Sequence, residues 1–330
     1  MLLLLACAPE PQAVDHALRG PYAVGHRALE VEGLVAELWY PAASEEPGLG
    51  VVEAFTADEQ AWIYEELLET ASCASTETAA GLDAPQAEGS FPVLVFSHCH
   101  ECTRFSSFTV AEQLASHGFL VAAADHAGNT LWDGLAGEGM DLDTDTLAMR
   151  VEQQHDLLDA ALQVEGADPS LVGAFGHSFG SVTTGMLAQE RYEVQAALGL
   201  AAPMENPLLP GVEVSELEQP LGFLVAVEDN SITELGNELM RSNFEEAGTA
   251  WKYEVADAGH WSFSDIVGVI DNFEPGCGQD TRQTDGSEFS YMDPVQGRET
   301  AAVFATAFFA QTLLDDEDAL QRLGWEIEGP

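Results

Sequence analysis

Basic residues are scarce in this chain of 330 residues. Ten lysines and arginines stand against 57 aspartates and glutamates, the formal net charge is −47, and Lys252 is the only lysine. Nucleic-acid binding depends on lysine and arginine contacts to phosphate groups. The composition therefore excludes nucleic acid as an expected partner. It predicts a strongly hydrated acidic surface, typical of salt-adapted or exported proteins.

Long hydrophobic runs are also missing, because no apolar stretch approaches the roughly 20 residues that span a bilayer. The chain begins MLLLLACAPEPQ, and the run that ends at Cys7 resembles a bacterial lipobox, although no basic segment precedes it. We therefore expect residues 1–19 to be a signal or tether segment with Cys7 as lipid anchor. This places the protein outside the cytoplasm, attached to the cell envelope membrane or secreted.

Cysteine is sparse, with five residues in the chain. If Cys7 carries lipid, four remain, and an even number in an oxidising compartment allows three disulfide pairings among Cys73, Cys99, Cys102 and Cys277. Cys99 and Cys102 have CxxC spacing, which is also typical of a redox pair or half of a zinc site. No second CxxC supports zinc.

The order of apolar and helical segments predicts an α/β fold. Residues 22–31 and 34–42 are strand-like and flank a Glu-Gly turn, which favours an antiparallel hairpin. Residues from about 44 to 90 read as a helical surface insertion. From residue 91 onward short apolar runs alternate with helical stretches, which predicts a mostly parallel central sheet with helices on both faces. We find no repeat and no second core, so residues 20–330 form one predicted domain.

The segment Gly176-His177-Ser178-Phe179-Gly180 fits GxSxG between an apolar strand and a helix-forming stretch. This setting predicts a turn so tight that only small residues fit beside the serine, whose hydroxyl is then held at a helix N-terminus. Ser178 is therefore the candidate nucleophile. His177 points elsewhere on such a turn, and we expect it to support the turn.

A serine hydroxyl needs an imidazole within hydrogen-bond reach to act as a nucleophile. His260 follows the last core strand, and the chain order serine, acid, histidine fits the arrangement of α/β-hydrolases. Asp229, at the end of the strand around residues 221–227, is the preferred acid. Glu228 is the alternative and Glu205 a further fallback.

Acyl transfer also needs two backbone N–H groups aimed at the developing oxyanion. Phe179, the residue after the nucleophile, is expected to supply one. The loop Ser97-His98-Cys99-His100-Glu101-Cys102 is expected to supply the other, from His100 or Cys99.

Four stretches together resemble the bacterial relatives of platelet-activating factor acetylhydrolase over roughly residues 20–310. They are FPVLVFSH, EQLASHGFLVAAADHAGNTLWDG, GAFGHSFGS and DAGHWSFSD. The resemblance implies an α/β-hydrolase fold, no cofactor, no metal, and hydrolysis of short or truncated acyl esters, including phospholipid-like ones. Carried over by position, it implies Ser178 as nucleophile, His260 as base, and the backbone of His100 and Phe179 as oxyanion hole.

The chain departs from this family at two places. Animal members place the acid where this chain has Ala201, so the acid moves to Asp229. The family's His-Gly-x-Gly pattern has become His98-Cys99-His100-Glu101. One hypothesis is that a disulfide of Cys99 or Cys102 fixes the loop geometry that glycine turns provide elsewhere.

Three alternatives compete with this interpretation. A cutinase-like or dienelactone-hydrolase-like enzyme would share the fold and the nucleophile but act on polyesters or lactones. A zinc hydrolase would use the histidines and thiols of residues 98–102. A non-catalytic surface lipoprotein on a hydrolase scaffold is the third, because a fold does not fix a function.

Overall fold

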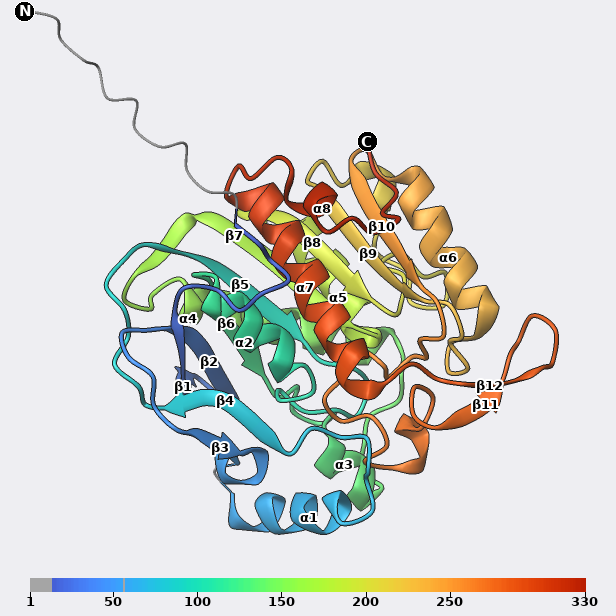
Figure 1. Cartoon of the computed structure of the whole chain (residues 1–330), viewed down its shortest axis with the longest axis horizontal. Helices are drawn as coiled ribbons and strands as arrows, with labels where there is room; N and C mark the ends of the chain where they lie inside the picture. Colours follow the sequence, from blue (N-terminus) through green and yellow to red (C-terminus); the bar gives the residue numbers. More distant parts are fainter. Residues whose placement is uncertain (1–13, 56) are drawn as a thin grey trace, which may run out of the picture.

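A sheet of ten strands crosses the molecule in the order β10-β9-β8-β7-β5-β6-β2-β1-β4-β3 (Figure 1). The computed structural model describes residues 14–55 and 57–330, so Cys7 lies outside the described residues. The strands of this sheet are β1 (Ala23–Val31), β2 (Leu34–Ala42), β3 (Gly48–Gly50), β4 (Glu77–Leu82), β5 (Phe91–Ser97), β6 (Leu120–Ala124), β7 (Ala167–His177), β8 (Val194–Leu200), β9 (Leu221–Ala226) and β10 (Ala250–Val255).

Strands β5 to β10 are parallel to one another, whereas β1 and β2 form the expected antiparallel hairpin. Every residue of β5 and of β6 is buried, because helices cover both faces of the sheet and leave no polar face. The predicted α/β fold, with a mostly parallel sheet and an antiparallel N-terminal hairpin, is confirmed.

Two groups of helices enclose the sheet (Figure 1). Helices α2 and α7 pack against one face of the sheet, and α4, α5 and α6 pack against the other. The helices are α1 (Asp58–Leu68), α2 (Phe108–Ser116), α3 (Leu131–Ala136), α4 (Thr144–Ala161), α5 (Phe179–Glu190), α6 (Thr233–Glu246), α7 (Pro294–Leu313) and α8 (Ala319–Arg322), with short 3₁₀ turns at Val51–Ala54, Val214–Glu216 and Asp271–Phe273. A separate small hairpin joins β11 (Gln279–Thr281) and β12 (Glu288–Ser290).

The segment expected to be a helical insertion, residues 44–90, is only partly helical. Helix α1 lies within it, but β4 pairs in parallel with β1, and β3 pairs with β4. The segment therefore extends the sheet edge as well as adding a helix. The small and β-branched residues of β4 (Glu77–Leu82) allow this edge pairing, and the sequence pattern alone did not reveal it.

The structure pairs the four remaining cysteines as Cys73 with Cys277 and Cys99 with Cys102. The first pair connects the segment after α1 to the loop that follows His260. Within residues 14–55 and 57–330, no helix has the length and apolar character needed to cross a membrane.

Candidate active site

Ser178 occupies a sharp turn between β7 and α5, with backbone angles φ 57° and ψ −123°. A non-glycine residue is rarely found in this region, and such strain is typical of a nucleophile turn. The flanking glycines are required by contact. A Cβ on Gly176 would lie 2.1 Å from the carbonyl oxygen of Gly180, and a Cβ on Gly180 would lie 1.9 Å from that of Ser97.

Three side chains from three loops meet at the carboxyl edge of the parallel strands. The His260 Nε2 atom lies 2.8 Å from Ser178 Oγ, and its Nδ1 atom lies 2.6 Å from Asp229 Oδ2. The Nδ1–H donates to the carboxylate, which leaves Nε2 free to accept the serine proton. Both His260 and Asp229 are buried. The arrangement can therefore generate a serine nucleophile.

The second carboxylate oxygen of Asp229 is also bound, because Oδ1 accepts the backbone N–H groups of Ser231 and Ile232, each at 2.9 Å. The side-chain amide of Gln283, in the β11–β12 hairpin, donates to the backbone carbonyl of Asp229. These contacts fix the direction in which the carboxylate faces.

The two alternative acids have other partners. The carboxylate of Glu228 pairs with the guanidinium of Arg282, which also pairs with Asp257. The carboxylate of Glu205 accepts the backbone N–H of Val214 at 2.8 Å. Asp229 alone of these acids contacts His260 in the described part of the chain.

His177 lies behind the catalytic imidazole. Its Nε2–H donates to the backbone carbonyl of His260 at 2.8 Å, and burial lowers the pKa of His177 to about 3. His177 therefore stays neutral and acts as a support for the loop that carries His260.

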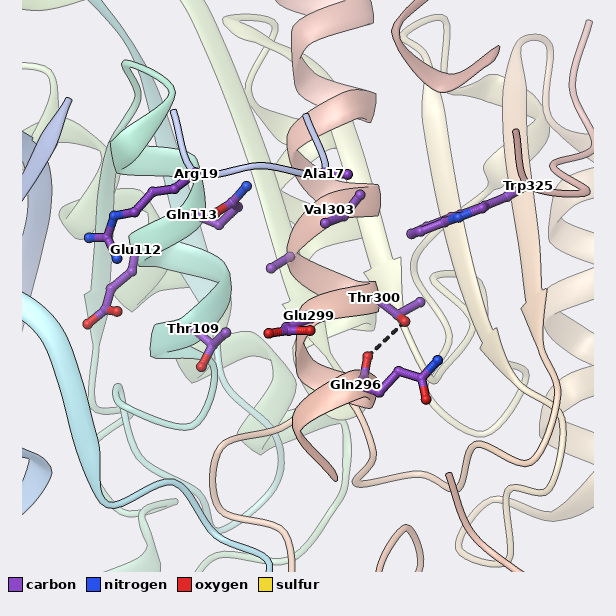
Figure 2. Close-up of a pocket in the computed structure, with 11 residues that line it drawn as sticks. Ala17, Arg19, Thr109, Glu112, Gln113, Gln296, Glu299, Thr300, Val303 and Trp325 are labelled. Carbon is purple, nitrogen blue, oxygen red and sulfur yellow. Dashed lines mark hydrogen bonds between the residues drawn. The ribbon is translucent and has the colours of Figure 1, made fainter. Parts of the chain in front are cut away.

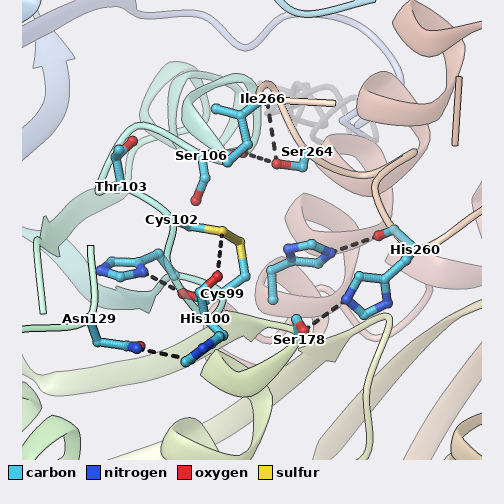
Figure 3. The surroundings of a disulfide bond; sticks show 12 residues. Cys99, His100, Cys102, Thr103, Ser106, Asn129, Ser178, His260, Ser264 and Ile266 are labelled. Atoms are coloured by element: carbon cyan, nitrogen blue, oxygen red, sulfur yellow. Dashed lines mark hydrogen bonds between the residues drawn. A yellow bond between two sulfur atoms is a disulfide. The ribbon is translucent and has the colours of Figure 1, made fainter. Parts of the chain in front are cut away.

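The loop between β5 and α2 faces Ser178 across the site (Figure 3). Its Cys99–Cys102 pair closes a short ring around His100, with Cα atoms 5.3 Å apart. Glu101, at a place where the related family has glycine, adopts a left-handed φ of 53°. The backbone N–H of His100 donates no hydrogen bond within residues 14–55 and 57–330. Phe179 begins α5, so its N–H lacks an intrahelical acceptor. Both groups are available to an anion.

An apolar pocket of about 220 Å³ opens beside Ser178. Its walls come from the segment before α4, the start of α5, the segment after β8 and the start of α6. Its lining residues are Leu142, Ser178, Phe179, Val182, Ala202, Pro203, Asn206, Leu208, Leu209, Ile232, Leu235, Gly236 and Leu239. None of them is charged. The pocket suits an apolar group attached to the carbon that Ser178 would attack.

The cluster of histidines and cysteines at residues 98–102 does not present metal ligands. The sulfur atoms of Cys99 and Cys102 are joined to each other, and His98 Nε2 accepts the backbone N–H of His126 at 2.9 Å. In the described ranges no group of three or more His, Cys, Asp or Glu side chains is arranged to hold a metal ion. The zinc hypothesis therefore lacks a ligand set here.

A second cavity, of about 510 Å³, lies between α2, α7 and the segment before β1 (Figure 2). Its lining mixes polar and apolar residues and includes Glu112, whose carboxylate oxygens accept the backbone N–H groups of Ala79 and Ala80. Ser178, Asp229 and His260 do not line this cavity. We assign Glu112 a structural role, which is to hold β4 to α2.

Two parts of the site, the apolar pocket and Arg150, were not predicted from the sequence. The apolar pocket is assembled from four segments distant in sequence, so no local pattern marks it. Arg150 on α4 is fully buried behind the β5–α2 loop. A sequence signal for it exists, because an arginine that shares a helix face with Leu147, Gln154 and Leu157 lies within a core-facing stripe.

Comparison with known protein families identifies the family of this chain. The sequence model of the dienelactone hydrolase family matches residues 80–265, which is more than half of the chain and includes Ser178, Asp229 and His260. The chain belongs to the dienelactone hydrolase family. This dienelactone hydrolase family member is an enzyme, a carboxylic-ester hydrolase of the serine type.

A second family model and a solved structure also match the chain. The model of platelet-activating factor acetylhydrolase, isoform II, matches residues 17–132. The solved structure of a ferulic acid esterase from Streptomyces cinnamoneus is 17% identical, with a TM-score of 0.65, covering 89% of this chain and 91% of that chain. It supports the α/β-hydrolase fold. No curated protein sequence matches the chain.

Proposed function

We propose that Ser178 is the nucleophile of this hydrolase, with His260 as general base, Asp229 as the acid that orients it, and the backbone N–H groups of His100 and Phe179 as oxyanion hole. The observation that carries the proposal is the continuous hydrogen-bond chain from Asp229 through His260 to Ser178. No cofactor is needed for this chemistry.

The reaction follows from these positions. Ser178 Oγ forms a bond to the ester carbonyl carbon while its proton moves to His260 Nε2, and the carbonyl oxygen becomes an anion facing the two N–H groups. The carbonyl then re-forms as the bond to the alcohol oxygen breaks, and that oxygen takes the proton from His260. Water attacks the acyl carbon while His260 takes its proton. The bond from that carbon to Ser178 Oγ then breaks, Oγ takes the proton back from His260, and the acid is released.

We propose short or truncated acyl esters, including phospholipid-like ones, as the substrate class. The pocket beside Ser178 is small and its lining is apolar and uncharged, which supports binding of a neutral acyl chain and disfavours a carboxylate-bearing group. Polyesters and lactones are the alternative substrates within the same chemistry.

Steady-state kinetics test this proposal. Purified protein is assayed with p-nitrophenyl esters of increasing acyl length, a truncated-chain phospholipid, a lactone and a polyester film, with and without a chelator. We expect the highest kcat/KM on short uncharged acyl esters and no effect of the chelator. Preference for the lactone or the polyester film would contradict the proposed substrate class. Loss of activity in the chelator would contradict the metal-free serine mechanism.

The proposal includes an oxidised Cys99–Cys102 pair and, in line with it, an extracytoplasmic location with Cys7 as lipid anchor. The ring that this pair closes surrounds His100, so it supports the loop where the family has glycine. Mass mapping of the purified protein is expected to recover residues 99 and 102 in one linked peptide. Recovery of both residues as free thiols would contradict the proposed disulfide.

A further inference from the structure

Arg150 is a fully buried guanidinium that has no acidic partner among residues 14–55 and 57–330. It projects from α4 towards the loop that follows β5. All of its hydrogen-bond acceptors in the described chain are neutral oxygens, namely those of Ser97 (side chain, 3.1 Å), His98 (backbone), Cys99 (backbone, 3.3 Å), Asn129 (side chain, 2.6 Å) and Thr183 (side chain, 3.3 Å).

This situation is unusual, because burying an unpaired charge is costly. Arg104, the other arginine among the largest fully buried side chains, pairs with the carboxylates of Glu37 and Asp125. The chain has ten lysines and arginines and a surplus of carboxylates, yet the acceptors of Arg150 are neutral hydroxyl and carbonyl oxygens.

Three acceptors of Arg150 lie in residues 97–99, at the start of the loop that carries the candidate oxyanion donor His100. A trans peptide holds its C=O and N–H in opposite directions. The Cys99 carbonyl accepts from Arg150 at 3.3 Å and from His98 Nδ1–H at 2.7 Å, so the N–H of His100, in the same peptide unit, points away from the guanidinium. The same relation holds for the His98 carbonyl and the N–H of Cys99.

Two more contacts connect Arg150 to the oxyanion donors. Asn129, which accepts from Arg150, donates its amide N–H to His100 Nδ1 at 2.8 Å, and Figure 3 shows this pair below the Cys99–Cys102 bridge. The guanidinium carbon also lies 4.5 Å from the centre of the Phe179 ring. Arg150 therefore contacts Phe179 directly and reaches His100 through Asn129, and these two residues would supply the oxyanion N–H groups.

We propose that Arg150 is a positioning residue of the oxyanion hole, which orients the His100 N–H through the Cys99 carbonyl and Asn129 and replaces the glycine turns that the loop lacks. Its uncancelled positive charge also favours a developing anion nearby. The inference rests on the proposed function, because it presumes that an oxyanion forms beside Ser178.

The test compares Arg150→Met with Gln154→Met. Gln154 is buried one turn along the same helix and donates to the carbonyl of Phe96, ahead of the loop, at 3.1 Å. We expect Arg150→Met to lower kcat on a short acyl ester by roughly 10- to 100-fold with little change in KM, since a lost oxyanion donor costs about 10²- to 10³-fold. Gln154→Met is expected to keep kcat within a few fold.

A spectroscopic measurement separates positioning from stability. An alkyl trifluoromethyl ketone forms a hemiketal with Ser178, and ¹³C NMR of the former carbonyl carbon follows the ionisation of its hydroxyl. We expect this ionisation to shift to higher pH in Arg150→Met and to remain at the wild-type pH in Gln154→Met. Equal shifts, or no shift, would overturn the proposal.

A second variant keeps the test decisive if Arg150→Met does not fold. Lysine retains the charge but lacks the planar fork that reaches several acceptors at once. Arg150→Lys is expected to show a smaller fall in kcat and a smaller shift of the hemiketal ionisation, and wild-type values for both would contradict the proposal. If wild-type protein forms no hemiketal at Ser178, the proposed function itself is wrong, which is a distinguishable result.

Discussion

The imidazole Nε2 of His260 lies 2.8 Å from the hydroxyl oxygen of Ser178, although 82 positions separate the two residues in the chain. The parallel sheet produces this meeting, because β7 and β10 end at the same edge.

Asp229 and Glu228 are adjacent carboxylates, and we expect neutralising them to have very different effects on kcat. Asp229→Asn removes the charge that orients His260, and we expect kcat to fall by about 10⁴-fold, as for the same change in a serine protease triad. Glu228→Gln loses only its pairing with Arg282 and is expected to keep kcat within a few fold. Ester kinetics on both variants check this. A larger loss in Glu228→Gln would assign the acid to Glu228.

The apolar pocket is expected to set acyl length. Ile232 lines the pocket and is half-buried, so Ile232→Phe reduces the space for a longer acyl chain. We expect kcat/KM for a hexanoate ester to fall about 10-fold or more relative to acetate, since one methylene in a pocket is worth roughly 1–3 kcal/mol. Val295→Phe, exposed at the start of α7, is the matched control and should leave the ratio unchanged. An unchanged ratio in Ile232→Phe would show that the acyl group binds elsewhere.

Glu112 is expected to make stability depend on pH. Burial raises the pKa of Glu112 from 4.5 to about 7 in the folded protein. The folded state therefore holds a proton that the unfolded state releases, so the contribution to stability is complete below about pH 4.5 and is lost as pH rises to about 7. Urea unfolding of wild type and Glu112→Gln measures this. The difference in unfolding free energy should fall by roughly 3 kcal/mol at most across that window, and a difference that is constant with pH would contradict the assignment.

The charge of −47 predicts a dependence on salt. Carboxylates repel one another over the surface, and salt shortens the screening length from about 10 Å at 0.1 M to about 3 Å at 1 M. We expect Tm to rise with sodium chloride at pH 7. The effect should shrink as the pH approaches the sequence isoelectric point of about 4.1. A Tm that is insensitive to salt at pH 7 would show that repulsion does not limit stability.

Much of the fold could be predicted because its signals are local. The hairpin of β1 and β2, the parallel strands and the GxSxG turn each follow from short patterns of apolar, small and turn-forming residues. The edge strand β4 could not be predicted, because its few pairing contacts with β1 are non-local and its residues are small.

The candidate site also contains residues that could be predicted from the sequence and residues that could not. Ser178, Asp229 and His260 follow the carboxyl ends of β7, β9 and β10, and the order of strands brings such positions together. The role of Glu228 as the partner of Arg282, the pocket walls and Arg150 depend on which side chains converge in three dimensions. Sequence separation hides these contacts.

Covalent labelling by an organophosphonate tests the central claim most directly. An activated serine attacks phosphorus and expels the leaving group, whereas an unactivated one does not. We expect one phosphonyl group per protein, mapped by mass spectrometry to Ser178, with parallel loss of esterase activity. Ser178→Ala should fold, resist labelling and lose turnover on the order of 10⁶-fold. Esterase activity that survives in Ser178→Ala, or a label on another residue, would contradict the account.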